Sequence, residues 1–161
     1  MKYFMAIALL LSVTAITQAQ EKDAAATEQL VESKNYVFKA ESVNPPRGRF
    51  RQLTSEYDLV VTGDTVIAYL PYFGRAYTAP INPSEGGIKF TSSDFEYKVE
   101  KKKKRSWEVF IRPKDSRDVQ ELYLTIFDNS RATLRVNSVN RESISFNGYI
   151  AEGKEKGKKA F

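Results

Sequence analysis

Short segments in which apolar and polar side chains alternate with a period of two run through most of this 161-residue chain. Phe95, Tyr97 and Val99, for example, alternate with Glu96 and Lys98. Successive residues of a strand point to opposite faces of a sheet, so this pattern predicts a strand with one buried face. About nine such segments, separated by turn signals, predict a mainly β protein with a single antiparallel domain, either barrel-like or a sandwich.

The turns between these segments are short, and one of them is a strong hairpin signal. Gly63 and Asp64 join a run at Tyr57–Thr62 to a second run at Thr65–Leu70, which is the pattern of a two-residue hairpin loop. Because short turns favour pairing between consecutive segments, we expect a meandering, barrel-like sheet in preference to a Greek-key sandwich. The remaining expected strands are Tyr36–Glu41, Ile88–Thr91, Phe95–Glu100, Trp107–Arg112, Val119–Phe127, Arg131–Asn137 and Ser143–Ile150.

The first nineteen residues have the pattern of a secretory signal peptide. Lys2 supplies a positive charge, Phe4–Val13 is an apolar run, and small residues at Thr17 and Ala19 fit a cleavage site. The apolar run is too short for a good membrane span, and an uncleaved N-terminal anchor is the alternative. We therefore expect cleavage near Ala19-Gln20, a periplasmic or secreted protein, and no stable membrane insertion after cleavage.

The chain beyond the expected signal peptide, residues 1–19, has the usual length of one domain. Residues 20–34 are polar and Ala-rich, and we expect a short helix at Ala24–Ser33 or a linker there. Residues 35–150 form the expected antiparallel β domain. Residues 151–161 are charged and contain glycine, so we expect a disordered tail.

The chain contains neither cysteine nor histidine. Thiol catalysis and Ser-His-Asp catalysis are therefore excluded, and a zinc site would have only carboxylate ligands. We predict no cofactor and no metal. A hydrolase that uses carboxylates alone remains as an enzyme route, but Asp58, Asp64, Glu85 and Asp94 form no evident catalytic pair. The sequence thus predicts a protein that is not an enzyme.

The formal net charge is +5, and two lysine-rich clusters produce it, at Lys101–Arg105 and Lys154–Lys159. Such clusters can bind nucleic acid or an anionic membrane. They can also be a solvated turn and a solvated tail, where lysines aid solubility and discourage pairing at sheet edges. We favour the second interpretation and predict no nucleic-acid partner.

The stretch Val66–Gly87 is rich in aromatic residues, prolines and glycines, which makes it the first place to look for a site. Rings there could stack on a sugar, a flat ligand or a lipid chain, and an arginine could pair with a carboxylate or phosphate. Alternatively the rings belong to the edge of the core, and Pro71 and Gly74 make a kink that closes the sheet. The candidate ligand-binding residues are Tyr69, Tyr72, Phe73, Arg75 and Tyr77.

Two stretches resemble a known family. Leu53–Asp64 (LTSEYDLVVTGD) and Tyr69–Gly87 (YLPYFGRAYTAPINPSEGG) are similar to the domain-of-unknown-function family DUF4251, which comprises small exported proteins of Bacteroidetes bacteria. The resemblance covers most of the chain after the signal peptide, and it implies an envelope or extracellular protein of a Gram-negative bacterium. It implies no established activity and supplies no catalytic residue.

Two hypotheses of function remain. The first is a binding module, a lipocalin-like or other small barrel that holds an apolar or glycan-like ligand at the aromatic stretch. The second is an interaction or structural protein that uses the same aromatic residues against another envelope protein or a second copy. A binding module predicts a concave pocket lined by at least two of the four aromatic side chains, whereas an interaction protein predicts an exposed, fairly flat patch.

Overall fold

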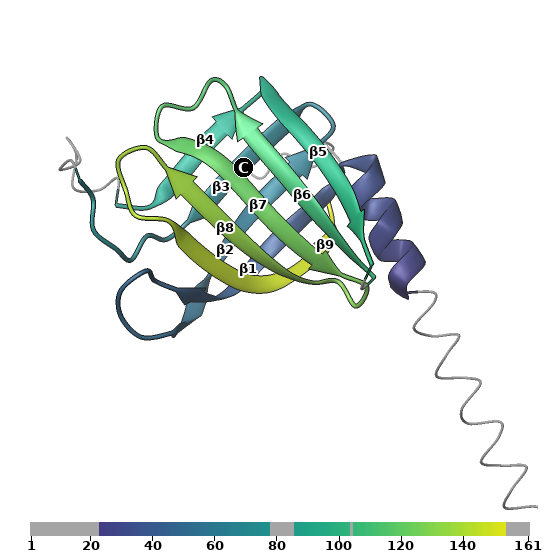
Figure 1. Cartoon of the computed structure of the whole chain (residues 1–161), viewed down its shortest axis with the longest axis horizontal. Helices are drawn as coiled ribbons and strands as arrows, with labels where there is room; N and C mark the ends of the chain where they lie inside the picture. The colour runs from purple at the N-terminus through teal and green to yellow at the C-terminus, as the bar shows by residue number, and fades with distance from the viewer. Residues whose placement is uncertain (1–22, 78–85, 104, 154–161) are drawn as a thin grey trace, which may run out of the picture.

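The protein forms one nine-stranded antiparallel sheet that rolls into a nearly closed barrel, with a helix at one end (Figure 1). The computed structural model describes residues 23–77, 86–103 and 105–153. The predicted mainly β, barrel-like fold with one N-terminal helix is confirmed. The expected signal peptide and the part of the aromatic stretch at residues 78–85 lie outside the described residues.

The strands follow the alternation of the sequence, because each strand buries one face. In β8, for example, Ala132, Leu134 and Val136 are buried and their neighbours are more exposed. The nine strands are β1 (Tyr36–Asn44), β2 (Arg51–Thr62), β3 (Thr65–Leu70), β4 (Ile88–Ser92), β5 (Phe95–Lys102), β6 (Ser106–Pro113), β7 (Val119–Phe127), β8 (Arg131–Ser138) and β9 (Ile144–Glu152).

The sheet is a meander with one additional closure. Its spatial order is β4-β3-β2-β1-β9-β8-β7-β6-β5, so the first strand pairs with the last and every other pair is consecutive in the chain. β4 and β5 are the two edges of the sheet, although only Ser93 and Asp94 separate them in sequence. The seam of the barrel therefore lies between two strands that a tight turn joins.

Apolar side chains pack the interior of the barrel. Phe38 of β1, Leu59 of β2, Leu134 of β8 and Phe146 of β9 are fully buried and belong to one apolar cluster. Burial of a side chain of this size contributes about 1.5–3 kcal/mol. A packed interior directs the search for a site to the ends and the outer face of the barrel.

β1 and β9 approach closely because β9 carries a glycine at the contact. Gly148 lies opposite Ala40, and a Cβ atom at position 148 would lie 1.9 Å from the carbonyl oxygen of Lys39. Only glycine therefore fits where the last strand pairs with the first. The register of β1 shifts between Ala40 and Ser42 against both of its neighbours, which is a β-bulge and increases the local twist.

The helix, residues 23–33, lies beside β5 at the open side of the barrel (Figure 1). It ends in a Schellman motif, in which Asn35 N–H donates to the Leu30 carbonyl (3.4 Å) and Lys34 N–H donates to the Val31 carbonyl (3.3 Å). Lys34 adopts the left-handed conformation that this motif requires, with φ of 52°. Among the described residues, no helix is long and apolar enough to cross a membrane.

Hydrogen bonds through two tyrosine hydroxyls link the helix to β5 and, through β5, to β1. Tyr97 of β5 donates to the carbonyl of Val31 in the helix (3.1 Å), and the hydroxyls of Tyr97 and Tyr36 of β1 lie 3.3 Å apart. Burial raises the pKa of Tyr97 to about 12 and raises the pKa of Tyr36 well above its usual value. The helix thereby contacts the seam at β5, which pairs with β6 alone among the described strands.

Several strands extend beyond the bounds that the sequence predicted, and β2 and β9 are two examples. β2 begins at Arg51, six residues before the expected Tyr57, and β9 continues to Glu152. β9 therefore runs past the expected last strand residue, Ile150, because Tyr36 pairs with Glu152, and Gly153 N–H donates to the carbonyl of Asn35 (3.3 Å). Residues 154–161 of the expected tail lie outside the described residues.

Candidate functional site

The aromatic segment, defined here as residues 69–77, begins with a tyrosine on the outer surface. Tyr69 is 46% exposed, and its ring stacks on the ring of Tyr57 with centroids 5.6 Å apart. The ammonium of Lys89, which lies opposite Tyr69 on β4, sits 4.9 Å from the centre of the Tyr69 ring. These three side chains form a small exposed cluster on the outer face of β2–β4.

Tyr72, by contrast, is bonded into the fold. Its hydroxyl lies 2.9 Å from the carbonyl oxygen of Arg75 and 3.1 Å from that of Glu142. Burial, followed by the nearby charge of Glu142, raises the pKa of Tyr72. A Cβ atom on Gly74 would lie 2.6 Å from the Tyr72 hydroxyl oxygen, so the chain curls tightly around this ring.

The loop between β8 and β9 holds the aromatic segment by its backbone. Tyr77 N–H donates to the carbonyl of Asn140 (2.7 Å), and Glu142 N–H donates to the carbonyl of Arg75 (3.3 Å). Arg141 in the same loop stacks its guanidinium 5.2 Å from the centre of the Tyr72 ring. The segment is therefore docked on the end of the barrel.

Arg141 itself is well anchored. Its guanidinium donates to the carbonyl of Gly87 (2.9 Å) and pairs with the carboxylate of Asp118 (3.2 Å). The neighbouring Glu142 pairs with Arg47 (3.3 Å), while its Oε2 atom is buried and has no hydrogen-bond partner among the described residues. These contacts join the β1–β2, β3–β4, β6–β7 and β8–β9 connections at one end of the barrel.

The remaining candidates of the segment differ in exposure. Phe73 is half-buried under the guanidinium of Arg51, which lies 4.9 Å from its ring centre. Arg75 is exposed, and Tyr77 is 71% exposed. The structure thus separates the five sequence-derived candidates into an outward tyrosine, two half-buried rings and two exposed side chains. None of the five lines either of the two hollows described for this surface.

The larger hollow, called the outer hollow below, lies on the outer face of the sheet formed by β5–β9. It is open to solvent and has a volume of about 1080 Å³. Most of its lining residues occupy the outward-facing positions of their strands, as Tyr123 and Thr125 do on either side of the buried Leu124. The lining residues are Lys98, Val99, Glu100, Glu108, Val109, Phe110, Tyr123, Leu124, Thr125, Thr133, Arg135, Asn137 and Ser145.

Two aromatic rings lie in the outer hollow. Phe110 of β6 lies opposite Tyr123 of β7, and their ring centroids are 5.1 Å apart with the planes tilted by 52°. The guanidinium of Arg112 lies 5.1 Å from the centre of the Phe110 ring. Tyr123 is 43% exposed, so the pair offers apolar ring surface to a ligand.

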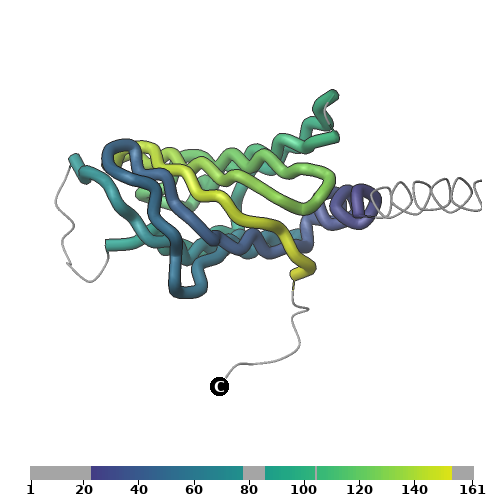
Figure 2. The backbone as a smooth tube through the Cα atoms, turned by 90° about the horizontal axis from the view of Figure 1, so that it is seen from below, coloured from purple at the N-terminus to yellow at the C-terminus, as the bar shows by residue number. Residues whose placement is uncertain are grey.

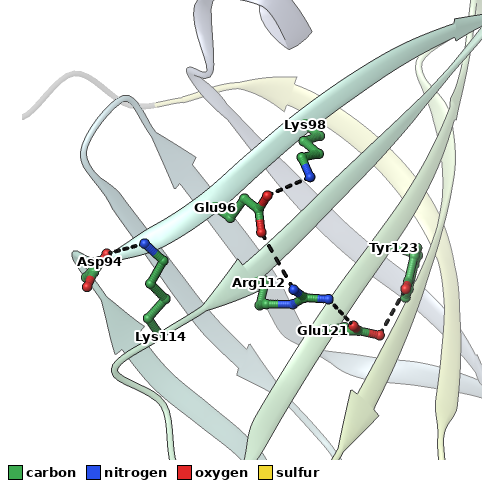
Figure 3. A network of polar contacts seen from close by, with 7 residues as sticks. All are labelled: Asp94, Glu96, Lys98, Arg112, Lys114, Glu121 and Tyr123. Carbon is green, nitrogen blue, oxygen red and sulfur yellow. Dashed lines mark hydrogen bonds and ion pairs between the residues drawn. The ribbon is translucent and has the colours of Figure 1, made fainter.

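A ladder of polar contacts runs across the strands beside these rings (Figure 3). Arg112 pairs with Glu121 at 2.8 Å and with Glu96 at 3.8 Å, and Glu96 pairs with Lys98 at 2.6 Å. The hydroxyl of Tyr123 donates to the second carboxylate oxygen of Glu121 at 2.9 Å. The ladder thus sets the position of the Tyr123 side chain.

These contacts also fix the charge states of the two carboxylates. The hydrogen bonds from Arg112, followed by that from Tyr123, lower the pKa of Glu121, and the contact with Lys98 lowers the pKa of Glu96. Both carboxylates are therefore ionised at neutral pH. A general acid needs a raised pKa, so neither carboxylate is suited to that role.

Neutral polar groups occupy the other side of the outer hollow. Thr125 and Thr133 lie opposite each other on β7 and β8, and the Thr133 hydroxyl donates to the side-chain carbonyl of Asn147 (3.1 Å). Ser145 lies opposite Arg135 on the next pair of strands. Within the described part of the chain, no group of three or more acidic side chains could hold a metal ion.

Sequence reasoning did not identify the outer hollow, although the sequence carries a signal for it. Phe110 and Tyr123 are aromatic residues at positions of β6 and β7 that face outward, where alternation predicts polar residues. An aromatic side chain on the polar face of a strand is the signal that could have found the site.

Comparison with known proteins gives the family and the fold. The family model described as domain of unknown function (DUF4251) matches residues 18–150. A crystal structure of a DUF4251 family protein from Bacteroides eggerthii is similar, with a TM-score of 0.58 and 16% sequence identity, over 83% of this chain and 88% of that chain. At this identity the likeness concerns the fold alone. No curated protein matches the chain.

Proposed function

The chain belongs to the DUF4251 family, and from this premise we propose that it is an exported, non-enzymatic binding protein that holds a glycan-like ligand in the outer hollow. The observation that carries the proposal is the Phe110–Tyr123 ring pair inside a hollow of about 1080 Å³. Ligand sites combine apolar and aromatic surface with a few polar groups that fix orientation. The outer hollow has this composition.

The chemistry of the lining favours a glycan over a purely apolar ligand. Sugars present apolar C–H faces that pack on aromatic rings, and their hydroxyl groups both donate and accept hydrogen bonds. The hydroxyls of Thr125, Thr133 and Ser145 and the amide of Asn137 match this requirement, because each can donate and accept. A lipid chain could not hydrogen-bond to these groups, and burying a polar group without a partner costs about 1–3 kcal/mol.

Binding without catalysis is supported by the state of the acidic residues near the rings. Glycoside hydrolysis needs one carboxylic acid with a raised pKa and a second carboxylate at a suitable distance. Glu96 and Glu121 are instead paired with cations, which lower the pKa of each. Export is supported by the signal-peptide pattern at residues 1–19.

The proposal is tested by titrating the isotope-labelled exported protein with neutral oligosaccharides prepared from the envelope of the cells that make it. Saturable shifts of the backbone amide signals of β6, β7 and β8 are expected, and Phe110→Ala is expected to abolish them. Phe50→Ala, which removes an exposed phenylalanine outside the hollow (59% exposed), is the control and should bind like the unchanged protein. Shifts confined to residues 69–77, or no shift with any fraction, would contradict the proposal.

A second candidate function uses the aromatic segment as a contact surface for another envelope protein. The exposure of Tyr77 at 71% favours it, because a large aromatic side chain left on the surface is a common interface anchor. A crosslinking photoreactive residue at position 77 should then capture a specific envelope protein in the cell. The same residue placed at position 50 serves as the control.

A further inference from the structure

β5 is an edge strand of the sheet, and the helix contacts it through the side chains of Tyr97 and Lys101, which reach the Val31 carbonyl and the Glu28 carboxylate. β5 pairs with β6 alone among the described strands, and its residues from Lys98 to Lys101 are exposed. Val99, at the centre of this stretch, is 41% exposed. Figure 2 shows the tip of the β5–β6 hairpin standing apart from the other strand ends. An edge of this kind can accept a further strand.

The hydrogen-bond pattern shows which backbone groups face the free side. Lys114 N–H donates to the carbonyl of Asp94 (2.8 Å), so this pair belongs to the hydrogen-bonded pairs of the β5–β6 ladder, which alternate with non-bonded pairs. The next pair, Phe95 and Pro113, is non-bonded, in agreement with the missing N–H of proline. The residues of β5 whose N–H and C=O groups point away from β6 are therefore Phe95, Tyr97, Val99 and Lys101.

We propose that β5 pairs antiparallel with β5 of a second copy of this chain, with the two-fold axis at Val99. This register places Val99 opposite Val99 of the second copy, and Tyr97 opposite its Lys101. Both are pairs of residues whose backbone groups point outward, so the hydrogen-bond pattern of the new ladder is satisfied. A closed two-fold contact of this kind uses the same surface on both copies.

The charges on the outer face of β5 select this register. Glu96 faces Lys102 of the second copy. Lys98 faces Glu100 of the second copy, and the symmetry repeats both pairs. Opposite charges directly across an antiparallel pair are favourable and like charges are unfavourable. Lys98 and Glu100 are exposed and Glu96 and Lys102 are half-buried, and within one copy Lys98 pairs with Glu96 and Lys102 with Glu100.

The neighbouring registers with the same hydrogen-bond pattern bring like charges together. Sliding the strands by two residues in one direction sets Lys98 opposite Lys98 of the second copy and Glu96 opposite its Glu100. Sliding them in the other direction sets Lys98 opposite Lys102 and Glu100 opposite Glu100. Of these three registers, only the one centred at Val99 is complementary in charge, which is the property that identifies a second copy as the partner.

The pairing would extend the sheet across two molecules. A two-fold axis between antiparallel strands is perpendicular to the sheet, so the outer faces of both copies lie on the same side. The two outer hollows would then adjoin, because Lys98 and Glu100 line the hollow on the β5 side. The dimer itself does not depend on the proposed glycan.

Sedimentation velocity of the exported protein over a range of concentrations tests the proposal. The unchanged protein should show a dimer that increases with concentration. Lys98→Glu and Glu100→Lys should each weaken the dimer roughly ten-fold, because two attractive pairs become repulsive. An equimolar mixture of the two variants should recover the association, since each carboxylate of the Lys98→Glu chain then faces an ammonium of the Glu100→Lys chain.

Arg49→Glu is the matched control, because it makes the same change in net charge as Lys98→Glu at an exposed position outside β5. It should associate like the unchanged protein. Thermal melts followed by circular dichroism verify that each variant is folded, and Val99→Pro, which removes an N–H that faces the free edge, is a second disrupting variant. A protein that stays monomeric at the highest concentration, or a dimer that Lys98→Glu does not weaken, would overturn the proposal.

Discussion

The aromatic segment and the outer hollow both present tyrosine rings, but different contacts hold these rings. Tyr72 in the segment reaches two backbone carbonyls, one of them in the β8–β9 loop. The hydroxyl of Tyr123 in the hollow donates to the carboxylate of Glu121, which is itself held by Arg112. The Tyr72 ring therefore connects two separate segments of the fold, whereas the Tyr123 ring lies on the outer face of the sheet and contacts side chains there.

This difference distinguishes side chains that hold the fold together, called scaffold below, from side chains that are free to contact a ligand, called site below. A side chain that satisfies backbone groups of another element is needed for folding, and its removal leaves those groups without partners. A side chain held by other side chains on the outer face can contact a ligand without loss of the fold. The number of aromatic residues in a stretch of sequence is therefore a poorer guide to a site than the contacts of each ring.

The largest expected effect is on stability. Tyr72→Ala should lower the free energy of unfolding by about 2–3 kcal/mol, because it removes a half-buried ring together with the hydroxyl that contacts the Glu142 carbonyl. Tyr123→Ala should cost about 1 kcal/mol or less, as expected for an exposed side chain in one aromatic pair. Urea unfolding followed by tryptophan fluorescence measures both. Equal losses for the two variants would break the distinction between scaffold and site.

Tyr36 and Tyr97, whose hydroxyls contact each other, are a second example of side chains that hold the fold together. They also predict that the stability of the protein depends on pH. The pKa of Tyr97 is raised to about 12, above its value of about 10 in the unfolded chain. The stability that this group contributes is therefore present below about pH 10 and is lost as the pH rises toward 12. Tyr97→Phe should cost about 1–2 kcal/mol at neutral pH, because the hydroxyl of Tyr36 loses its partner.

The matching measurement is urea unfolding at pH values from about 8 to about 11.5. This range spans the ordinary tyrosine pKa of about 10. Tyr97→Phe should show a shallower loss of stability with rising pH than the unchanged protein. Tyr123→Phe, which removes a hydroxyl on the outer face, is the control at neutral pH. If the free energy of unfolding falls equally with rising pH in both proteins, ionisation of the Tyr97 hydroxyl does not destabilise the fold, and this prediction is wrong.

The smallest expected effect concerns the charge ladder beside the rings. Arg112→Gln should raise the pKa of Glu121 toward its usual value, because the hydrogen bond from Arg112 is the largest cause of the lowered pKa. Carbon NMR of the glutamate carboxyl groups during an acid titration follows this change directly. Lys114→Gln, which removes a cation that pairs with Asp94 on the same face, should leave the Glu121 titration unchanged. If Arg112→Gln leaves the pKa of Glu121 unchanged, Arg112 does not hold Glu121 in place, and the polar contacts do not position Tyr123 as described.

The fold could be predicted from the sequence because its signals are local. Alternation over a few residues marked each strand, and Gly63 and Asp64 marked a hairpin that the structure contains. Strand ends were less accurate, since β9 extends to Glu152 only because β1 lies beside it. Pairing between the first and last strands is not visible in the local pattern of either one.

The site depended on contacts that no local pattern contains. Phe110 and Tyr123 become neighbours only through the register of β6 and β7, and residues from five strands line the hollow around them. The aromatic segment attracted attention because its rings are close in sequence. The contact that fixes Tyr72 is made with Glu142, 70 residues further along the chain, and the local sequence gives no indication of it.

The central claim is that the outer hollow, and not the aromatic segment, binds the ligand. Tyr123 and Tyr69 test it as a matched pair, because they are 43% and 46% exposed on different parts of the sheet. Native mass spectrometry of both alanine variants, purified gently from the envelope beside the unchanged protein, measures the retained ligand. The account predicts that Tyr123→Ala loses an added mass that Tyr69→Ala keeps. Retention by Tyr123→Ala and loss by Tyr69→Ala would contradict it.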